Sequence, residues 1–161
     1  MNIKYLLFAL LITLSACKEE SQVPEIVDLT EFGLDFISEN SVLNQHWAPF
    51  WIKSVDGTIL WINESYKRNL LHPLGLRYDQ MVGTKGEILG DKFCKKILAN
   101  DRIVLYTESM MLFEESIPGI GKGISYKEPI YDHSGVLIGT MGHWIINRED
   151  MKNLIKLYES N

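Results

Sequence analysis

The sequence has little of what defines several common protein classes. Only two cysteines occur in 161 residues, which excludes a scaffold held by disulfides. Its longest uncharged apolar run, from Tyr5 to Leu14, is shorter than the roughly 20 residues of a transmembrane helix. Lys and Arg number 16 against 21 Asp and Glu, so we expect no basic surface for nucleic acid.

What remains is enough for one folded domain. The chain is 46% hydrophobic and 23% charged, with a formal net charge of -5. At this length a single domain is the usual organisation, and such a chain buries a sizeable core without covalent staples. The sequence contains no internal repeat.

The N-terminus has the pattern of a secretory signal peptide. Lys4 precedes the apolar run, and the small residues Ser15 and Ala16 stand before Cys17. The segment Leu14-Ser15-Ala16-Cys17 resembles the lipobox of bacterial lipoproteins. The resemblance implies removal of residues 1–16 and attachment of acyl chains such as palmitate to Cys17. Alternative interpretations are an uncleaved anchor helix, or an ordinary signal peptide with an unrelated cysteine.

A lipidated Cys17 would hold the folded part at a membrane, because each buried methylene contributes roughly 0.8 kcal/mol. The predicted location is the bacterial cell envelope, on the periplasmic side. Lys18 rather than Asp follows the cysteine, which favours the outer membrane over the inner one by the rule known for enteric bacteria.

The rest of the chain divides into three predicted segments. Residues 17–38 form a tether and lead-in, 39–148 the folded domain, and 149–161 a C-terminal helix. Two runs rich in aromatic and β-branched residues flank Asp56-Gly57, which predicts a β-hairpin. Asn63 suits the start of a short helix that ends near Pro73 and Gly75.

Further along the chain, apolar spacing around 93–105 predicts either one long helix or two short ones hinged at Asn100-Asp101. Three strands follow, at 110–115, 124–131 and 136–146. Helices gathered in the middle of an antiparallel sheet indicate an α+β domain. No pair of strands is joined by a long regular helix, which disfavours a Rossmann sheet.

Several segments together resemble a PAS domain. Residues 49–66 resemble its opening hairpin and the helix start that follows, and 78–83 resemble its short helix ending in glycine. Glu114-Glu115 and residues 127–142 resemble its closing three strands, with a last hairpin that has Gly135 in the turn and Gly139 and Gly142 after it. The resemblance extends over about residues 40–150.

The resemblance implies a five-stranded antiparallel sheet with short helices over one face and a pocket between them. Members of the family are mostly sensors or interaction modules that bind small molecules, haem or flavin and pass a change to an output domain. Here Asn147-Arg148-Glu149-Asp150 replaces the usual exit motif. The expected output is therefore a partner acted on in trans, and a homodimer is possible within the family.

The two best-known cofactors are disfavoured. Haem-binding relatives use a histidine on the long middle helix, whereas residues 92–108 contain none. Flavin photosensors use an Asn-Cys-Arg motif, which is absent around Cys94. We interpret Cys94 as a buried thiol, although Lys95 and Lys96 could lower its pKa. The histidines show no metal-ligand spacing, so no metal is predicted and the cofactor stays unknown.

Aromatic side chains are the main candidates for a ligand pocket, since small-ligand sites combine aromatic walls with a few polar groups. The alternative is plain core packing. Two polar residues are also candidates: Arg102, which either clamps a carboxylate or lies on a solvated helix face, and His143, which either faces the pocket or does not. The full set of predicted ligand-binding residues is Trp51, Trp61, Tyr66, Arg102, Tyr106, Tyr126 and His143.

No catalytic constellation is present in the sequence. It has no Gly-x-Ser-x-Gly and no Ser-x-x-Lys motif, and the glycines at 119–123 lack the spacing of a phosphate-binding loop. We therefore predict a lipid-anchored PAS-like sensory module that is not an enzyme and binds a small organic ligand. The alternative is a protein–protein adaptor or dimerisation module with a filled core.

Overall fold

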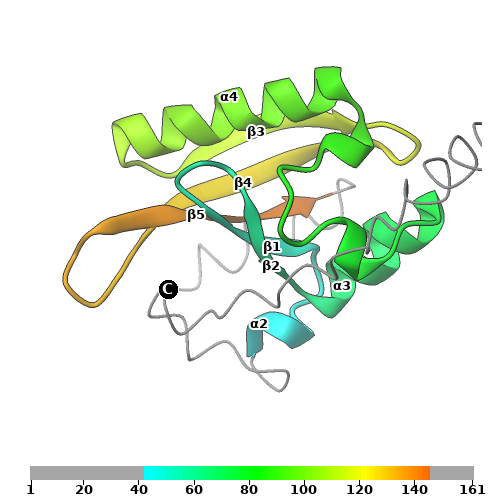
Figure 1. The fold of residues 1–161 in the computed structure, drawn as a ribbon, viewed down its shortest axis with the longest axis horizontal. Helices are drawn as coiled ribbons and strands as arrows, with labels where there is room; N and C mark the ends of the chain where they lie inside the picture. Colours follow the sequence, from blue (N-terminus) through cyan, green and yellow to red (C-terminus); the bar gives the residue numbers. More distant parts are fainter. Residues whose placement is uncertain (1–41, 146–161) are drawn as a thin grey trace, which may run out of the picture.

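A five-stranded antiparallel sheet forms the centre of the computed structural model, which describes residues 42–145 (Figure 1). The spatial order of the strands is β2-β1-β5-β4-β3. Their bounds are β1 Phe50–Ser54, β2 Ile59–Ile62, β3 Met111–Ile117, β4 Gly121–Tyr131 and β5 Leu137–Ile145. The predicted α+β class with a five-stranded antiparallel sheet is confirmed.

The hairpin of β1 and β2 turns at Asp56-Gly57, as the sequence predicts. The Ser54 amide donates to the Thr58 carbonyl at 2.9 Å, and Gly57 has φ 91°, a conformation that costs glycine little. The pairing is interrupted by a bulge. Ile52 pairs with Trp61 but Lys53 pairs with Ile59, so Leu60 is the additional residue and the alternation of side chains changes there.

Short helices connect the first hairpin to the long helix of the domain. Asn63 begins the first of them, because its Oδ1 accepts a 2.8 Å hydrogen bond from the Tyr66 amide. Gly75 follows the third helix after the hairpin and ends it in a left-handed conformation, φ 68°. The connecting segments are α3 Glu64–Tyr66, η2 Lys67–Leu71, η3 His72–Leu74, η4 Tyr78–Gln80 and η5 Glu87–Leu89, while the short helix α2, Val42–Gln45, precedes the hairpin.

One continuous helix, α4, spans Asp91–Thr107. Of the two predicted alternatives, the structure has the single helix. Asn100 and Asp101, which could have capped a second helix, are instead buried on the side of α4 that faces the sheet. Because both side chains have partners in the core, neither caps a second helix, and α4 continues through this point without a break.

The sheet is covered differently on its two faces. Helix α4 lies across one face, above β3 and β4, while α2 lies on the other side (Figure 1). The α4 face carries an apolar cluster that includes Trp51, Ile62 and Trp144. The opposite face carries a smaller cluster of Phe50, Ile52, Leu60 and Ile130. Strand alternation thus gives the sheet two packed faces.

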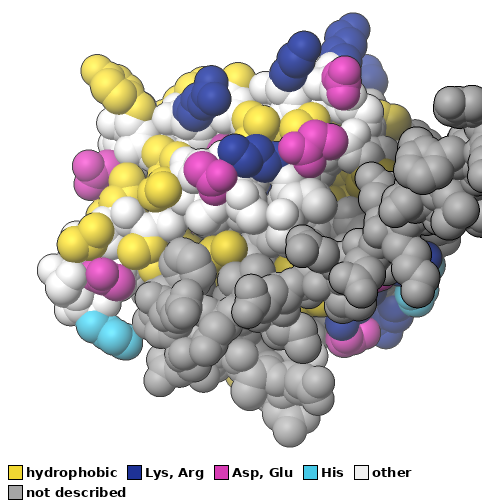
Figure 2. Space-filling model, viewed as in Figure 1, with side chains coloured by type: hydrophobic (Ala, Val, Ile, Leu, Met, Phe, Trp, Pro, Cys, Tyr) yellow, Lys and Arg dark blue, Asp and Glu magenta, His cyan; other side chains and the backbone are white. Residues whose placement is uncertain are grey.

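Basic side chains follow the outer surface of α4 (Figure 2). Lys92, Lys95, Lys96 and Arg102 are all exposed there. No helix within residues 42–145 is long and apolar enough to cross a membrane. The predicted signal peptide 1–16, Cys17, the 17–38 tether and the 149–161 helix lie outside the described residues.

Candidate functional site

A small cavity lies between the sheet and the helices, on the α4 face. Its volume is about 30 Å³, enough for about two water molecules. The wall is mostly apolar, with four polar side chains among its members. The lining residues are Trp51, Lys53, Ile59, Tyr66, Leu70, Gly86, Leu89, Phe93, Ile97, Glu115, Ile117, Ser125, Lys127 and Trp144.

Two glycines in the sheet make room for two indole rings beside the cavity. A Cβ on Gly142 would lie 2.9 Å from Trp51 Cζ2, and a Cβ on Gly123 would lie 2.6 Å from Trp144 Nε1. The rings therefore pack closely against the backbone of neighbouring strands. Tyr66 packs edge-on against Trp51, with ring centroids 6.2 Å apart.

Both indole nitrogens are buried without a hydrogen-bond partner. Trp51 Nε1 and Trp144 Nε1 are enclosed, and neither has an acceptor among the described residues. A buried indole N–H ordinarily has a partner, because leaving a donor unpaired costs about 1 to 3 kcal/mol. Because neither nitrogen has accessible surface, the two donors lie in the packed core beside the cavity and not on its wall.

A buried cluster of charges connects the cavity to α4. Asp101, on α4, accepts hydrogen bonds from Lys53 Nζ at 2.7 Å and from Lys127 Nζ at 2.6 Å. Lys127 also lies 3.1 Å from Glu115 Oε1. Each of these four side chains is at most 5% exposed. Residues from β1, β3, β4 and α4 therefore meet in one cluster, which contains two positive and two negative groups.

Neutral side chains complete the bonding of Glu115. Asn100 Nδ2 donates to Glu115 Oε1 at 2.8 Å, and the Ser125 hydroxyl donates to Oε2. All four carboxylate oxygens of Asp101 and Glu115 thus have a hydrogen-bond donor or an ammonium partner. A buried carboxylate needs such partners to stay ionised.

The charge cluster shifts the pKa of its members in directions that fit this packing. Burial lowers the pKa of Lys53 below its ordinary value, although the charge of Asp101 acts in the opposite direction. Burial acts to raise the pKa of Asp101, but Lys53 and Lys127 together outweigh it, and the net shift is downward. Burial also raises the pKa of Tyr66, and the charge of Glu115 adds to that shift.

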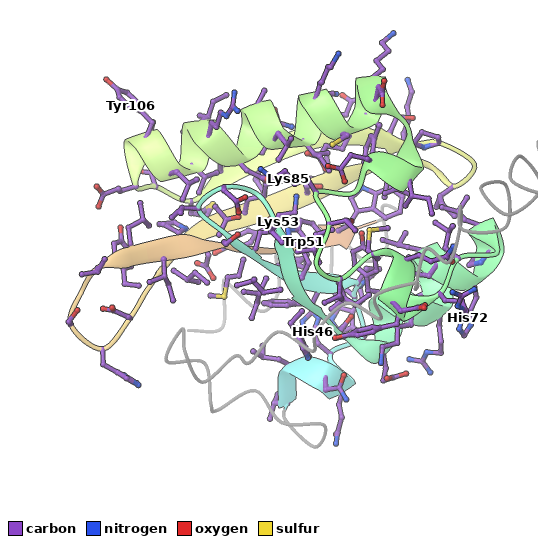
Figure 3. All side chains as sticks on the ribbon, in the orientation of Figure 1. His46, Trp51, Lys53, His72, Lys85 and Tyr106 are labelled. Carbon is purple, nitrogen blue, oxygen red and sulfur yellow. The ribbon has the colours of Figure 1, made fainter. Side chains whose placement is uncertain are left out.

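The structure brings two of the seven predicted site residues to the cavity. Trp51 and Tyr66 line it, and Figure 3 shows Trp51 and Lys53 together beneath α4. The other five lie elsewhere. Three are on the opposite face of the sheet: Trp61, Tyr126 and His143.

A bulge and strand alternation explain those three positions. The additional residue Leu60 moves Trp61 to the opposite face, where it packs edge-on against Phe50 at 6.3 Å. On β4, Ser125 and Lys127 face the cavity, so Tyr126 between them faces away. His143 stacks on Tyr126 with ring centroids 4.8 Å apart. Burial lowers the pKa of His143 to about 4, and His46 contributes to the shift.

The remaining two predicted residues are on the solvent side of α4. Arg102 is exposed, so the helix turns it away from the cavity next to the inward-facing Asp101. Tyr106 is 91% exposed and points outward from the end of α4 (Figure 3). The solvated-face interpretation of Arg102 is therefore the one that its position matches.

The charged residues in the cavity wall and in the cluster beside it were not predicted from the sequence. Lys53, Asp101, Glu115 and Lys127 were not among the candidates, since charged residues are rarely buried. One signal was present. Lys53 sits inside an otherwise apolar strand, at a position that alternation places on the same face as Trp51.

Cys94 is a buried thiol, as predicted. Its Sγ lies 3.3 Å from the Lys85 carbonyl, and burial raises its pKa. The alternative, that neighbouring lysines lower the pKa, is therefore wrong, because Lys95 and Lys96 are exposed. Among residues 42–145, no group of three or more His, Cys, Asp or Glu is arranged to hold a metal ion.

Comparison with known proteins rests on structure. No protein-family model matches the sequence, and no curated protein matches it. The PAS domain of Bordetella pertussis BvgS aligns with a TM-score of 0.52 and 20% identity, over 74% of this chain and 93% of that one. Vibrio cholerae VqmA aligns with a TM-score of 0.54 and 18% identity, over 66% of this chain.

A phage VqmA–DPO complex aligns with a TM-score of 0.55 and 15% identity, over 73% of this chain and 55% of that one. The present chain corresponds to about half the length of VqmA from Vibrio cholerae, 50%. At these identities the likeness concerns the fold. Together with the strand order and the long helix α4 over one face, it shows that residues 42–145 have the fold of a PAS domain.

Proposed function

We propose that this protein is a sensory module that binds a small organic molecule in the cavity between α4 and the sheet. The observation that carries the proposal is the wall of this cavity, where the aromatic residues Trp51 and Trp144 lie together with the buried, charged residue Lys53. Of the fold relatives, the phage VqmA structure is described as a complex with DPO, which agrees with a ligand role for such a cavity.

Signal transfer would pass through the charge cluster. Lys53 lines the cavity and also holds Asp101 of α4. A ligand that bonds to Lys53 would therefore change the balance of forces on α4 and shift the population between two states. The output in this proposal is a partner protein, acted on in trans from a lipid anchor at Cys17 in the cell envelope.

A second candidate function is a protein–protein adaptor with a filled core. The small cavity volume favours it, because about 30 Å³ is far below the roughly 300 to 1,000 Å³ of most ligand pockets. A ligand larger than a few atoms would have to displace a wall segment, such as η5 with Leu89. The adaptor needs no such movement.

Native mass spectrometry of the full chain, purified from its own host, separates the two functions. A retained small molecule, lost in a variant with Trp51→Ala, supports the sensor. The mass of the protein alone, with no thermal shift across a metabolite panel, supports the adaptor.

The lipid anchor has its own test. The variant Cys17→Ser should move the protein from the membrane fraction to the soluble fraction, and retention in the membrane fraction contradicts lipidation.

A further inference from the structure

The outer side of α4 carries positive charges that have no counter-charge within residues 42–145. This range contains 11 acidic and 11 basic side chains, and five of the bases form salt bridges with its acids. Six bases form no salt bridge inside the described range. Four of those six lie on one exposed stripe of α4, where residues three and four positions apart are neighbours: Lys92, Lys95, Lys96 and Arg102.

This arrangement is unfavourable for the helix itself. Lys92 has Lys95 and Lys96 as neighbours on the helix surface, and like charges at this spacing destabilise a helix. All three lie in the first two turns, where the positive end of the helix dipole adds to the repulsion. Asp91 is the one exposed acid of α4. Lys96 Nζ donates to the Glu114 backbone carbonyl at 2.8 Å, which supplies no charge. An anionic partner on this face would relieve the repulsion.

The segment that precedes the domain has the opposite charge. Residues 19–39 contain no Lys or Arg and seven acidic side chains, a third of all the acids in the chain. The seven are Glu19, Glu20, Glu25, Asp28, Glu31, Asp35 and Glu39. The chain thus consists of a strongly acidic lead segment followed by a charge-balanced domain with one basic helix face. Blocks of like charge commonly serve as interaction segments.

The lead segment is long enough to reach α4. Helix α2, which begins at Val42, lies on the other side of the sheet from α4 (Figure 1), so the segment must pass around an edge of the domain. Its 21 residues extend to roughly 70 Å at about 3.3 Å each. A compact domain of this size has a radius of gyration of only about 13 Å. The geometry of the chain therefore allows the contact.

The charges favour this segment over an anionic membrane as the occupant of the basic face. A segment of the same chain is present at an effective concentration in the millimolar range, and its contact needs no second molecule. The acidic segment also lies between Cys17 and the domain. An anionic lipid surface would repel it, since such surfaces attract basic segments.

We infer that residues 19–39 bind along the outer side of α4, with their carboxylates on the basic stripe at 92–102. Each exposed ion pair contributes little by itself, so the contact depends on several pairs and on low salt. It covers α4 until a more strongly anionic partner displaces the segment. The inference depends neither on a ligand in the cavity nor on a lipid at Cys17.

Carbodiimide crosslinking followed by mass spectrometry tests the contact, because this reagent joins a lysine amine directly to a carboxylate. The full chain is reconstituted in phosphatidylcholine vesicles, which have no net charge, at about 20 mM salt. Mixing ¹⁴N-labelled and ¹⁵N-labelled chains separates crosslinks within one chain from those between two. Lys122 is the internal control, because it is exposed at the start of β4 and has no salt bridge among the described residues.

The expected crosslinks join Lys92, Lys95 or Lys96 to acids of residues 19–39 within one chain. They should be at least fivefold more abundant than crosslinks from Lys122 to the same acids. Raising the salt to about 0.5 M should reduce them at least fivefold, because the Debye length falls from about 20 Å to about 4 Å.

A pair of arginine variants checks the role of charge without removing a reactive lysine. Arg102→Gln takes one positive charge from the basic stripe and should reduce the crosslinks two- to threefold. Arg68→Gln is the matched control, because Arg68 is also exposed and without a salt bridge among the described residues but lies on η2. It should leave the crosslinks unchanged. Equal effects of the two variants contradict a contact at α4.

Three further outcomes would overturn the inference. Yields no higher than those of Lys122 at low salt refute the contact. Crosslinks found mainly between ¹⁴N and ¹⁵N chains assign the basic face to a second copy. Loss of the crosslinks when phosphatidylglycerol replaces part of the phosphatidylcholine, with the Lys122 yield unchanged, assigns the face to an anionic membrane.

Discussion

Lys53 on β1 donates a 2.7 Å hydrogen bond to Asp101 on α4, and both side chains are almost fully buried. The pair joins the sheet to the helix that covers it. Lys127 on β4 bonds to the other oxygen of the same carboxylate. A single carboxylate on α4 is thus held by two strands of the sheet, both of which also line the cavity.

Asp101→Asn should be strongly destabilising. The amide keeps the size of the side chain but leaves two buried ammonium groups without their main counter-charge. Breaking a buried ion pair from one side costs about 3 to 5 kcal/mol. Urea unfolding monitored by circular dichroism measures the loss.

The matched control is Glu64→Gln, which breaks the exposed pair between Glu64 and Lys67. It should cost less than about 1 kcal/mol. Equal losses for the two variants would show that the cluster around Asp101 contributes no more than a surface pair.

Gly142→Ala should destabilise the domain through a direct clash. The added Cβ would lie 2.3 Å from the Tyr126 carbonyl oxygen and 2.9 Å from the Trp51 ring. Backbone cannot move aside without disturbing the β4–β5 pairing, so we expect a loss of at least about 2 kcal/mol, in the range of overpacked cores. Thermal unfolding of the variant checks this value.

Gly75→Ala is the control for Gly142→Ala. It meets no atom within 4 Å but has φ 68°, so only backbone strain of about 1 to 2 kcal/mol is expected. The ¹H–¹⁵N signal of the Trp51 indole should move in Gly142→Ala and stay in place in Gly75→Ala. A Trp51 signal unchanged in both would contradict the close packing of its ring on the sheet.

Local signals in the sequence were sufficient for the strands and turns. The Asp56-Gly57 hairpin and the Asn63 helix start depend on residues a few positions apart, and both are present. The cavity and the charge cluster beside it were harder to predict, because the members of the cluster are distant in sequence. Lys53 and Asp101 are 48 positions apart, and Lys127 and Asp101 are 26 apart. Nothing local distinguishes such a buried charge from a solvated one.

The aromatic candidates show a second limit on predicting the site from the sequence. Alternation along β5 places Thr140, Gly142 and Trp144 on one face and His143 on the other, but alternation alone does not say which face holds the cavity. Both faces of this sheet are packed, so an aromatic residue fits either one. For Trp61 the decisive feature is a bulge between β1 and β2, which no local sequence pattern locates.

Cys94 should react slowly with thiol reagents in the folded protein. It is 5% exposed and burial raises its pKa, and both effects reduce attack by the thiolate. In a Cys17→Ser background, alkylation by iodoacetamide at pH 8 should be at least tenfold slower in buffer than in urea. Equal rates would place the thiol at the surface.

The domain should lose stability in mild acid because of His143. Its folded pKa is about 4, against about 6.5 in an unfolded chain. Between those values the unfolded chain binds more protons, so stability is complete above about pH 6.5 and falls as the pH approaches 4. Below about pH 4 the free energy of unfolding has lost about 3 kcal/mol through His143, since each unit of difference between the two pKa values corresponds to roughly 1.4 kcal/mol.

His143→Gln should flatten that pH dependence, because the variant has nothing to titrate at this position. The measurement is urea unfolding at pH steps between 4 and 7. His133→Gln is the matched control, since His133 is exposed in the β4–β5 turn and should leave the wild-type slope intact. If His143→Gln keeps the wild-type slope, another group causes the acid sensitivity. If His133→Gln abolishes the pH dependence, the buried His143 stacked on Tyr126 is not its origin.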